Sequence, residues 1–182
     1  MARSISTAWI ACSHLLEWGH RRIGFICATN RYAMETTLRW QGHLRALAES
    51  ERAGHPAQTR IHAAEDVAVW ERDPDAMAAY FRSPDGPTGI VAWNDFEAVR
   101  FIRLLHSARL RVPEDISIVG FDKLPVSEDC IPPLTTVDQY VETQLRTVME
   151  MLSRPTAPPS TQSFVIVPTL VKRSSCAPPR AG

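Results

Sequence analysis

A short apolar run, Ile116–Val119, constrains the fold more than any other stretch of this chain. Pro113 precedes the run and Gly120 follows it, so the run has the length of a strand and not of a helix. A strand that is apolar on both sides is typical of a parallel sheet covered by helices on both faces. Asp122 then follows the strand, at the position where open α/β sheets place their ligand-contacting loops.

Two further apolar runs, Arg22–Cys27 and Gly89–Trp93, have the same character, and Thr59–Ala63 is a weaker candidate strand. Segments whose apolar residues recur at helical spacing separate these runs, at residues 7–18, 37–51, 75–82 and 96–108. Residues 64–74 fit either a loop or the start of a helix. The alternation of helices and strands predicts the α/β class, with a parallel sheet sandwiched by helices.

The composition of the chain limits the partners that it could bind and the compartment in which it could act. Twenty Lys and Arg residues balance twenty Asp and Glu residues, and this formal net charge of +0 argues against binding a polyanion by bulk electrostatics. The four cysteines are far apart, without zinc or disulfide spacing, as is typical of reduced cytosolic thiols. The sequence has neither a run of ~18 apolar residues nor a signal-peptide pattern. We therefore expect a cytoplasmic protein that uses no membrane, metal or cofactor.

Two polar residues mark a candidate binding site. Asn94 and Asp122 each follow a buried strand directly, so both are expected at the same edge of the sheet. An Asp accepts hydrogen bonds from hydroxyl groups and an Asn both accepts and donates, which suits a polyol or a sugar ring. The structural alternatives are a turn-capping role for Asp122 and a helix N-cap for Asn94; the latter is compatible with ligand binding if Asp95 does the capping. Trp70 or Trp93 could cover a sugar ring, although a core position explains either residue better.

A catalytic function has little support in the sequence. The acidic residues and the six histidines form no spaced constellation, and the motifs GxSxG, GxGxxG and the P-loop do not occur. We therefore predict no catalytic residues. A small flavodoxin-like or sugar-metabolising α/β enzyme is the alternative, and it would need a nucleophile or a base among the strand-tip loops.

Six segments taken in order, HLLEWGHRRIGFI, LRWQGHLRAL, PTGIVAWND, LRVPEDISIVGFD, PPLTTVDQ and LVKRSS, resemble the effector-binding domain of LacI/GalR-type repressors. The same fold occurs in periplasmic sugar-binding proteins, which are a further alternative. The resemblance extends from about Ile5 to Lys172. There are two departures: the acid expected ahead of the first helix is missing near Arg3, and Lys123 replaces the second acid usual after the strand at Ile116.

The resemblance implies two more site residues. Arg39 lies at the family's ligand-contacting arginine position, although an arginine in a helix's first turn is by itself usually a solvated charge. Gln139 matches the polar residue at which the chain crosses the hinge between two lobes. The effector-binding residues are thus expected to be Arg39, Asn94, Asp122 and Gln139. The implied function is to bind a small effector, most simply a sugar, between the lobes of a homodimeric regulator.

The resemblance also implies a division of the chain. Family members begin with a DNA-binding headpiece and most of an N-terminal lobe, neither of which is present here, so operator DNA would be bound only through a headpiece absent from this chain. We expect a C-terminal lobe, an interlobe crossing, a remnant of the N-terminal lobe, a returning strand and a frayed tail, at residues 5–124, 125–139, 140–168, 169–173 and 174–182. The proline-rich loop in the crossing argues against a helix there.

The remnant of the second lobe contains apolar residues that need to be buried. Val141–Leu152 has an apolar stripe at helical spacing, and Phe164–Val167 is an apolar run that needs cover on both faces. In the resembled fold both elements pack into the N-terminal lobe. We therefore expect residues 139–167 either to be poorly ordered in a monomer or to be buried against another chain, and to expose a contiguous apolar patch.

Overall fold

The computed structural model describes residues 2–27, 34–153 and 166–180. Its centre is a six-stranded sheet in the order β2-β1-β3-β4-β5-β6. Five strands are parallel, and only β6 runs antiparallel to its neighbour β5. The strands are β1 (Arg22–Ile26), β2 (Gln58–His62), β3 (Gly89–Ala92), β4 (Ser117–Phe121), β5 (Thr135–Asp138) and β6 (Thr169–Val171).

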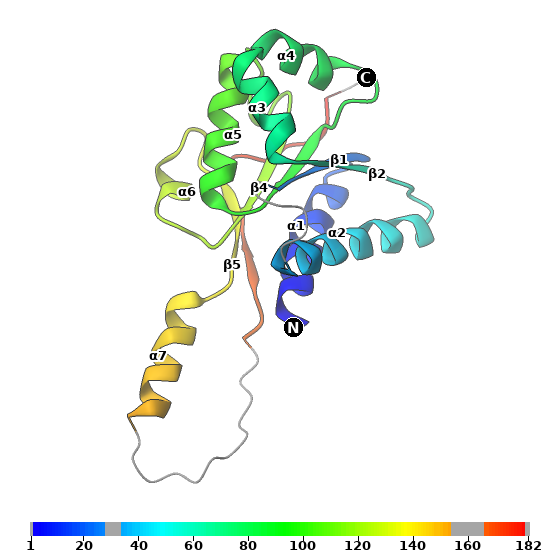
Figure 1. Cartoon of the computed structure of the whole chain (residues 1–182). Coiled ribbons are helices and arrows are strands. Elements are labelled where there is room, and N and C mark those ends of the chain that lie inside the picture. The colour runs from blue at the N-terminus through cyan, green and yellow to red at the C-terminus, as the bar shows by residue number, and fades with distance from the viewer. Residues whose placement is uncertain (1, 28–33, 154–165, 181–182) are drawn as a thin grey trace.

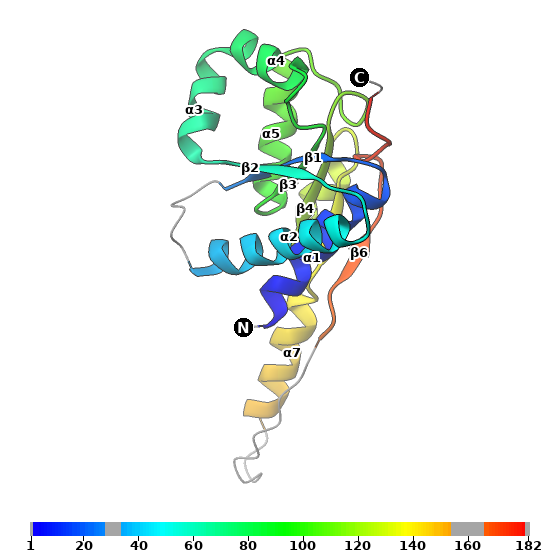
Figure 2. The same cartoon turned by 90° about the vertical axis from the view of Figure 1, so that its right-hand side faces the viewer.

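Helices cover both faces of the sheet, which confirms the predicted α/β sandwich (Figures 1 and 2). One face is covered by α1 (Ala2–Glu17) and α2 (Met34–Arg52), and the other by α3 (Ala64–Arg72), α4 (Pro74–Arg82) and α5 (Asp95–Ser107). The segment 64–74, which fitted a loop or a helix, is thus mainly α3. A single turn, α6 (Val126–Asp129), lies beside α5, and α7 (Val141–Leu152) follows β5.

The strands are apolar because each of them contributes to two cores. Along β3, Ile90 packs with the aromatic residues of α4 and α5, whereas Val91 packs with α1 on the opposite face. Along β4, Ile118 packs in the same core as Ile90, and Val119 packs in the same core as Val91. All four side chains are fully buried. Removing apolar surface from water on both faces accounts for the short, continuous apolar runs in the sequence.

The proline-rich segment differs from expectation in two ways. Residues 126–129 form the one-turn helix α6, which is possible because Pro125 stands at its N-cap, where no backbone N–H is needed. Residues 135–138 form β5, which pairs with β4 through Val119 and Thr135. The sheet therefore extends to Asp138, and any crossing to a second lobe begins beyond that residue.

The C-terminal segment was expected to fray, and for residues 174–180 this was wrong. Ser175 is fully buried, and its carbonyl oxygen accepts a hydrogen bond of 2.8 Å from the backbone N–H of Ile118. The Ser175 hydroxyl donates to the carbonyl oxygen of Ile118 at 2.6 Å. Arg180 donates to the carbonyl oxygen of Phe81. These hydrogen bonds join the C-terminal segment to β4 and to α4, so the segment is held against the sheet.

Helix α7 extends away from the rest of the molecule (Figure 1). No residue of α7 is buried, and the predicted apolar stripe is exposed: Leu145 is 62 % exposed and Leu152 is 77 % exposed. The expected apolar patch is therefore present. Phe164 and Val165 lie outside the described residues, while Ile166 and Val167 are not part of a strand.

Candidate functional site

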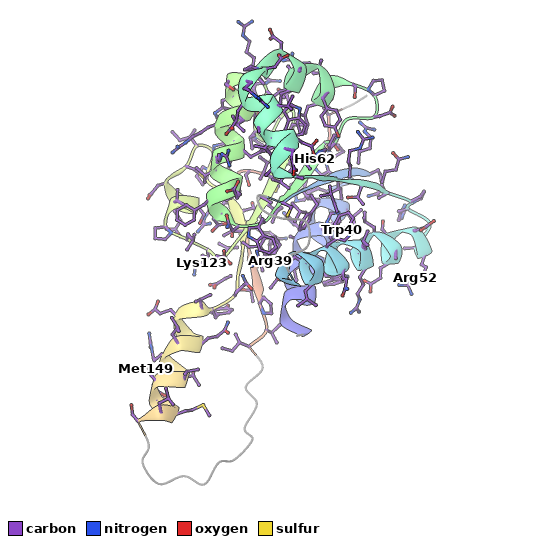
Figure 3. The ribbon with its side chains drawn as sticks, viewed as in Figure 1. Arg39, Trp40, Arg52, His62, Lys123 and Met149 are labelled. Atoms are coloured by element: carbon purple, nitrogen blue, oxygen red, sulfur yellow. The ribbon has the colours of Figure 1, made fainter. Side chains whose placement is uncertain are left out.

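The carboxyl ends of β3, β4 and β5 form one edge of the sheet, and three of the four predicted site residues follow them. Asn94 comes after β3, Asp122 directly follows β4, and Gln139 directly follows β5. Arg39 reaches the same edge from α2, the helix after β1. The prediction that Asn94 and Asp122 share one edge is confirmed. Figure 3 shows Arg39 and Lys123 on the side of the sheet from which the chain leaves towards α7.

Three of the predicted residues are in contact. The Arg39 Nη2 atom lies 3.8 Å from Asp122 Oδ1, and Gln139 Nε2 donates a hydrogen bond of 2.5 Å to the same oxygen. Arg39 Nη1 donates to the carbonyl oxygen of Trp93. These bonds hold a partly buried carboxylate between a cation and an amide, so the acceptor at the strand tip has a fixed position.

The Arg39 guanidinium also lies over an aromatic surface. Its Cζ atom is 4.2 Å from the centre of the Trp93 ring and 5.1 Å from that of Phe121, so both contacts are within cation–π range. The half-buried Trp93 is therefore part of this site. By contrast, Trp70 is buried among Phe81 and Phe101, as its core interpretation predicted.

Asn94 is the N-cap of a helix, the structural alternative to a ligand-binding role. Its side-chain oxygen accepts a hydrogen bond of 2.8 Å from the backbone N–H of Glu97, which makes Asn94 the N-cap of α5. Asp95 does not share this role. The Asn94 side chain retains an NH2 group that can donate to a ligand at the same edge. The participation of Asn94 in effector binding remains a prediction.

The turn after β4 has an uncommon backbone. Asp122 and Lys123 have φ angles of 94° and 51°, in the left-handed region that Asp tolerates better than most residues. The backbone N–H of Asp122 donates to the carbonyl oxygen of Val137 at 3.0 Å. Lys123, which replaces the usual second acid, pairs with Asp138 at 3.0 Å. The departure at Lys123 thus adds an ion pair that fixes this turn to the end of β5.

Asp95 is a site residue that the sequence analysis missed. It is fully buried and accepts hydrogen bonds from the backbone N–H of Leu124 at 2.8 Å and from the Thr136 hydroxyl at 2.6 Å. A Cβ atom on Gly120 would come within 2.3 Å of its Oδ1 atom, so only glycine leaves room for this carboxylate. Burial, with a smaller effect from the nearby charge of Asp122, raises the pKa of Asp95 to about 6.

A signal for Asp95 was present in the sequence. It is followed at helical spacing by Ala98, Val99 and Ile102, all of which are buried, so it begins the inward stripe of α5. An acid on an inward stripe needs hydrogen-bonding partners. Asp95 has two such partners, which connect α5 to the turn after β4 and to β5. It therefore positions the turn that carries Asp122.

The sequence from residue 12 to residue 176 matches the family described as the periplasmic binding protein-like domain. The chain belongs to this family. Its curated relatives include the transcriptional regulator GalR of Escherichia coli K12, at 34% identity over 94% of this chain and 49% of the relative. The repressor PurR of Haemophilus influenzae PittEE is 33% identical over 75% of this chain and 39% of its own length. The chain therefore spans less than half the length of these relatives.

Solved structures agree with the family and with the fold. A dimeric Lac repressor with an 11-residue C-terminal deletion superposes with a TM-score of 0.75 at 25% identity, covering 97% of this chain and 63% of that one. The transcriptional regulator CelR in complex with cellobiose gives a TM-score of 0.66 at 27% identity, covering 95% and 52%. Within the family, this chain is an effector-binding domain of the LacI/GalR type, and these relatives are regulators rather than enzymes.

Three further observations concern the described residues alone. No helix among them combines the length and the apolar character that would let it cross a bilayer. They bring together no group of three or more His, Cys, Asp or Glu side chains arranged to hold a metal ion. No disulfide joins the four cysteines, and Cys12 and Cys27 are buried.

Proposed function

We propose that this domain senses a small hydroxylated effector, a sugar or a sugar derivative, at the carboxyl edge of its sheet. The observation that carries the proposal is the Asp122 carboxylate, held at the tip of β4 by Arg39 and Gln139. A carboxylate accepts hydrogen bonds from vicinal hydroxyl groups, while the arginine fork and the Gln139 amide donate to ring and hydroxyl oxygens. The half-buried Trp93 adds an aromatic surface beside them.

The comparison with CelR supports the choice of a sugar. That regulator was solved with cellobiose and is 27% identical to this chain over 95% of its length. In this chain the site residues lie at the carboxyl edge of the sheet, and α7 leaves from the same edge. A second lobe would then close over the effector from the side of α7, which agrees with the division of the chain proposed above, with residues 140–168 in that lobe.

We also propose that the full-length protein is a homodimeric, cytoplasmic transcriptional regulator. GalR is an HTH-type transcriptional regulator, PurR is an HTH-type transcriptional repressor, and the Lac repressor structure is a dimer. Effector binding would change the relative position of the lobes and thereby the affinity for operator DNA. Contact with the operator would come from parts of the protein outside this chain.

The test replaces Asp122 in the full-length regulator and measures binding of a panel of mono- and disaccharides by calorimetry. Asp122→Asn removes the charge from the acceptor, and a hydrogen bond to a charged group contributes about 1.5–3 kcal/mol, so affinity should fall by about 10- to 150-fold. Asp129→Asn, on the exposed turn α6, is the matched control and should bind normally. Unchanged sugar affinity in Asp122→Asn would contradict the proposal.

A further inference from the structure

A concave site lies at the opposite edge of the sheet from Asp122. It has a volume of about 210 Å³ and is formed by the amino ends of β1 and β2, the last turn of α4 and the loop before β3. Its polar lining residues are Arg22, Gln58, Thr59, Arg60, Tyr80 and Asp85. Arg22 and Gln58 are the first residues of β1 and β2, and they lie opposite each other on these two neighbouring strands. Because the strands are parallel, this pocket is separated from Asp122 by the length of the sheet.

Local packing fixes the wall that carries Arg22. The Arg22 Nε atom donates a hydrogen bond of 2.9 Å to the carbonyl oxygen of Gly86. A Cβ atom on Gly86 would come within 2.4 Å of the Tyr80 carbonyl oxygen, so the loop before β3 lies directly against the end of α4. The guanidinium of Arg22 is thereby held at the pocket wall, and its two NH2 groups remain to donate to a ligand.

The pocket is lined by a second guanidinium, that of Arg60. The Cζ atom of Arg60, on β2, lies 5.9 Å from the centre of the Tyr80 ring. Beside these two arginines the pocket contains a single carboxylate, that of Asp85. Gln58 and Tyr80 add further groups that can donate. The pocket therefore has one net positive charge and more donors than acceptors.

We propose that this pocket binds the oxyanion of a small metabolite, a phosphate or a carboxylate group. Guanidinium groups present parallel N–H donors that match the oxygens of either group, and two of them lining one pocket can bind one anion together. The pocket, with a volume of about 210 Å³, suits a small anionic group. It is distinct from the sugar site in both position and charge, since the sugar site pairs its arginine with Asp122.

The test uses the chain as it stands, titrated with inorganic phosphate and, separately, with malonate, at constant ionic strength maintained with chloride. Backbone amide shifts measured by NMR should saturate at Arg22, Gln58 and Arg60, with little change at Asp122. Arg60→Gln, an exposed residue whose replacement leaves the core intact, should weaken binding at least 10-fold, and Arg22→Gln should do the same. Arg103→Gln, exposed on α5, is the matched control and should leave the affinity unchanged.

The outcomes separate the alternatives. Saturation by phosphate but not by malonate would identify a phosphate-bearing ligand, and the reverse result a carboxylate. Absence of saturable shifts with both probes would overturn the proposal. The same follows if Arg60→Gln binds as the unsubstituted chain does, or if the shifts appear at Asp122 instead. Neither result would bear on the sugar site, which is tested by its own substitution.

Discussion

Asp95 allows the most direct test of how the site is built. Its carboxylate is fully buried between α5, β5 and the turn after β4, and the pKa of the carboxyl group is raised from its ordinary value of 3.8 to about 6. The folded protein therefore binds this proton more tightly than the unfolded chain does. The stability contributed by neutral Asp95 is complete below about pH 4 and is lost as the pH rises through 6. The pKa difference corresponds to about 3 kcal/mol.

The substitution Asp95→Asn removes the titration while keeping the shape. Its amide oxygen can still accept from the backbone N–H of Leu124, and its NH2 group can donate to the Thr136 hydroxyl once that hydroxyl rotates. We expect the variant to gain up to about 3 kcal/mol relative to the unsubstituted chain between pH 4 and pH 7.5, because it has no charge to bury. At pH 4, Asp95→Ala should lose about 1–3 kcal/mol for each of the two donors left unpaired. This deficit should shrink towards pH 7.5, because the alanine also has no charge to bury.

Urea unfolding followed by circular dichroism at pH 4, 5, 6 and 7.5 gives the free energy of unfolding for each variant. The decisive quantity is the difference between Asp95→Asn and the unsubstituted chain at each pH, because the contributions of all other titrating groups cancel in it. A difference that stays constant across this range would refute the assignment of the raised pKa to Asp95. Asp129→Asn, which replaces an exposed acid, serves as the control.

Three further predictions concern other parts of the chain. Gly120→Ala should destabilise the fold by about 1–3 kcal/mol in the same urea assay, because its Cβ atom would lie 2.3 Å from Asp95 Oδ1; a neutral result would mean that the carboxylate can move aside. The chain, with formal net charge +0, should show no salt-sensitive binding to duplex DNA in an anisotropy titration, and a clear salt slope would contradict this. Leu145→Glu should reduce self-association in analytical ultracentrifugation without lowering the melting temperature, because the side chain is 62 % exposed; equal association would show that the apolar face of α7 is not responsible.

The sequence predicted the strands that are buried on both faces, because burial on both sides produces an apolar run whose length is easily recognised. It missed β5 because Thr135 and Thr136 do not form such a run, although both are fully buried. Their hydroxyl groups are satisfied instead: Thr136 donates to Asp95, and Thr135 accepts from the backbone N–H of Arg173. Since these partners are distant in sequence, the local sequence pattern does not predict the hydrogen bonds.

The candidate site, too, was predictable from the sequence only in part. The position of Asn94 and Asp122 at one edge followed from their places after parallel strands, whereas Arg39 and Gln139 were implied only by the family resemblance. The contact between Asp95 and Gly120 depends on the packing of α5 against β4, so the inward stripe could have indicated a buried acid but not its partners. The tail was expected to fray because its Pro- and Ala-rich composition does not reveal the hydrogen bonds that Ser175 makes.

Under the proposed function, Gln139 connects the effector site to the segment that leaves the domain. Its side chain donates to Asp122, while its backbone carbonyl oxygen accepts from the Gln144 side chain, which belongs to the first turn of α7. Between them, Tyr140 has a left-handed backbone with φ of 54°. An effector hydroxyl that donates to Asp122 would compete with Gln139 for the same carboxylate oxygen. Effector binding would therefore act on Gln139, which lies two residues before α7 begins and belongs to one of the connections between this domain and the segment that leaves it.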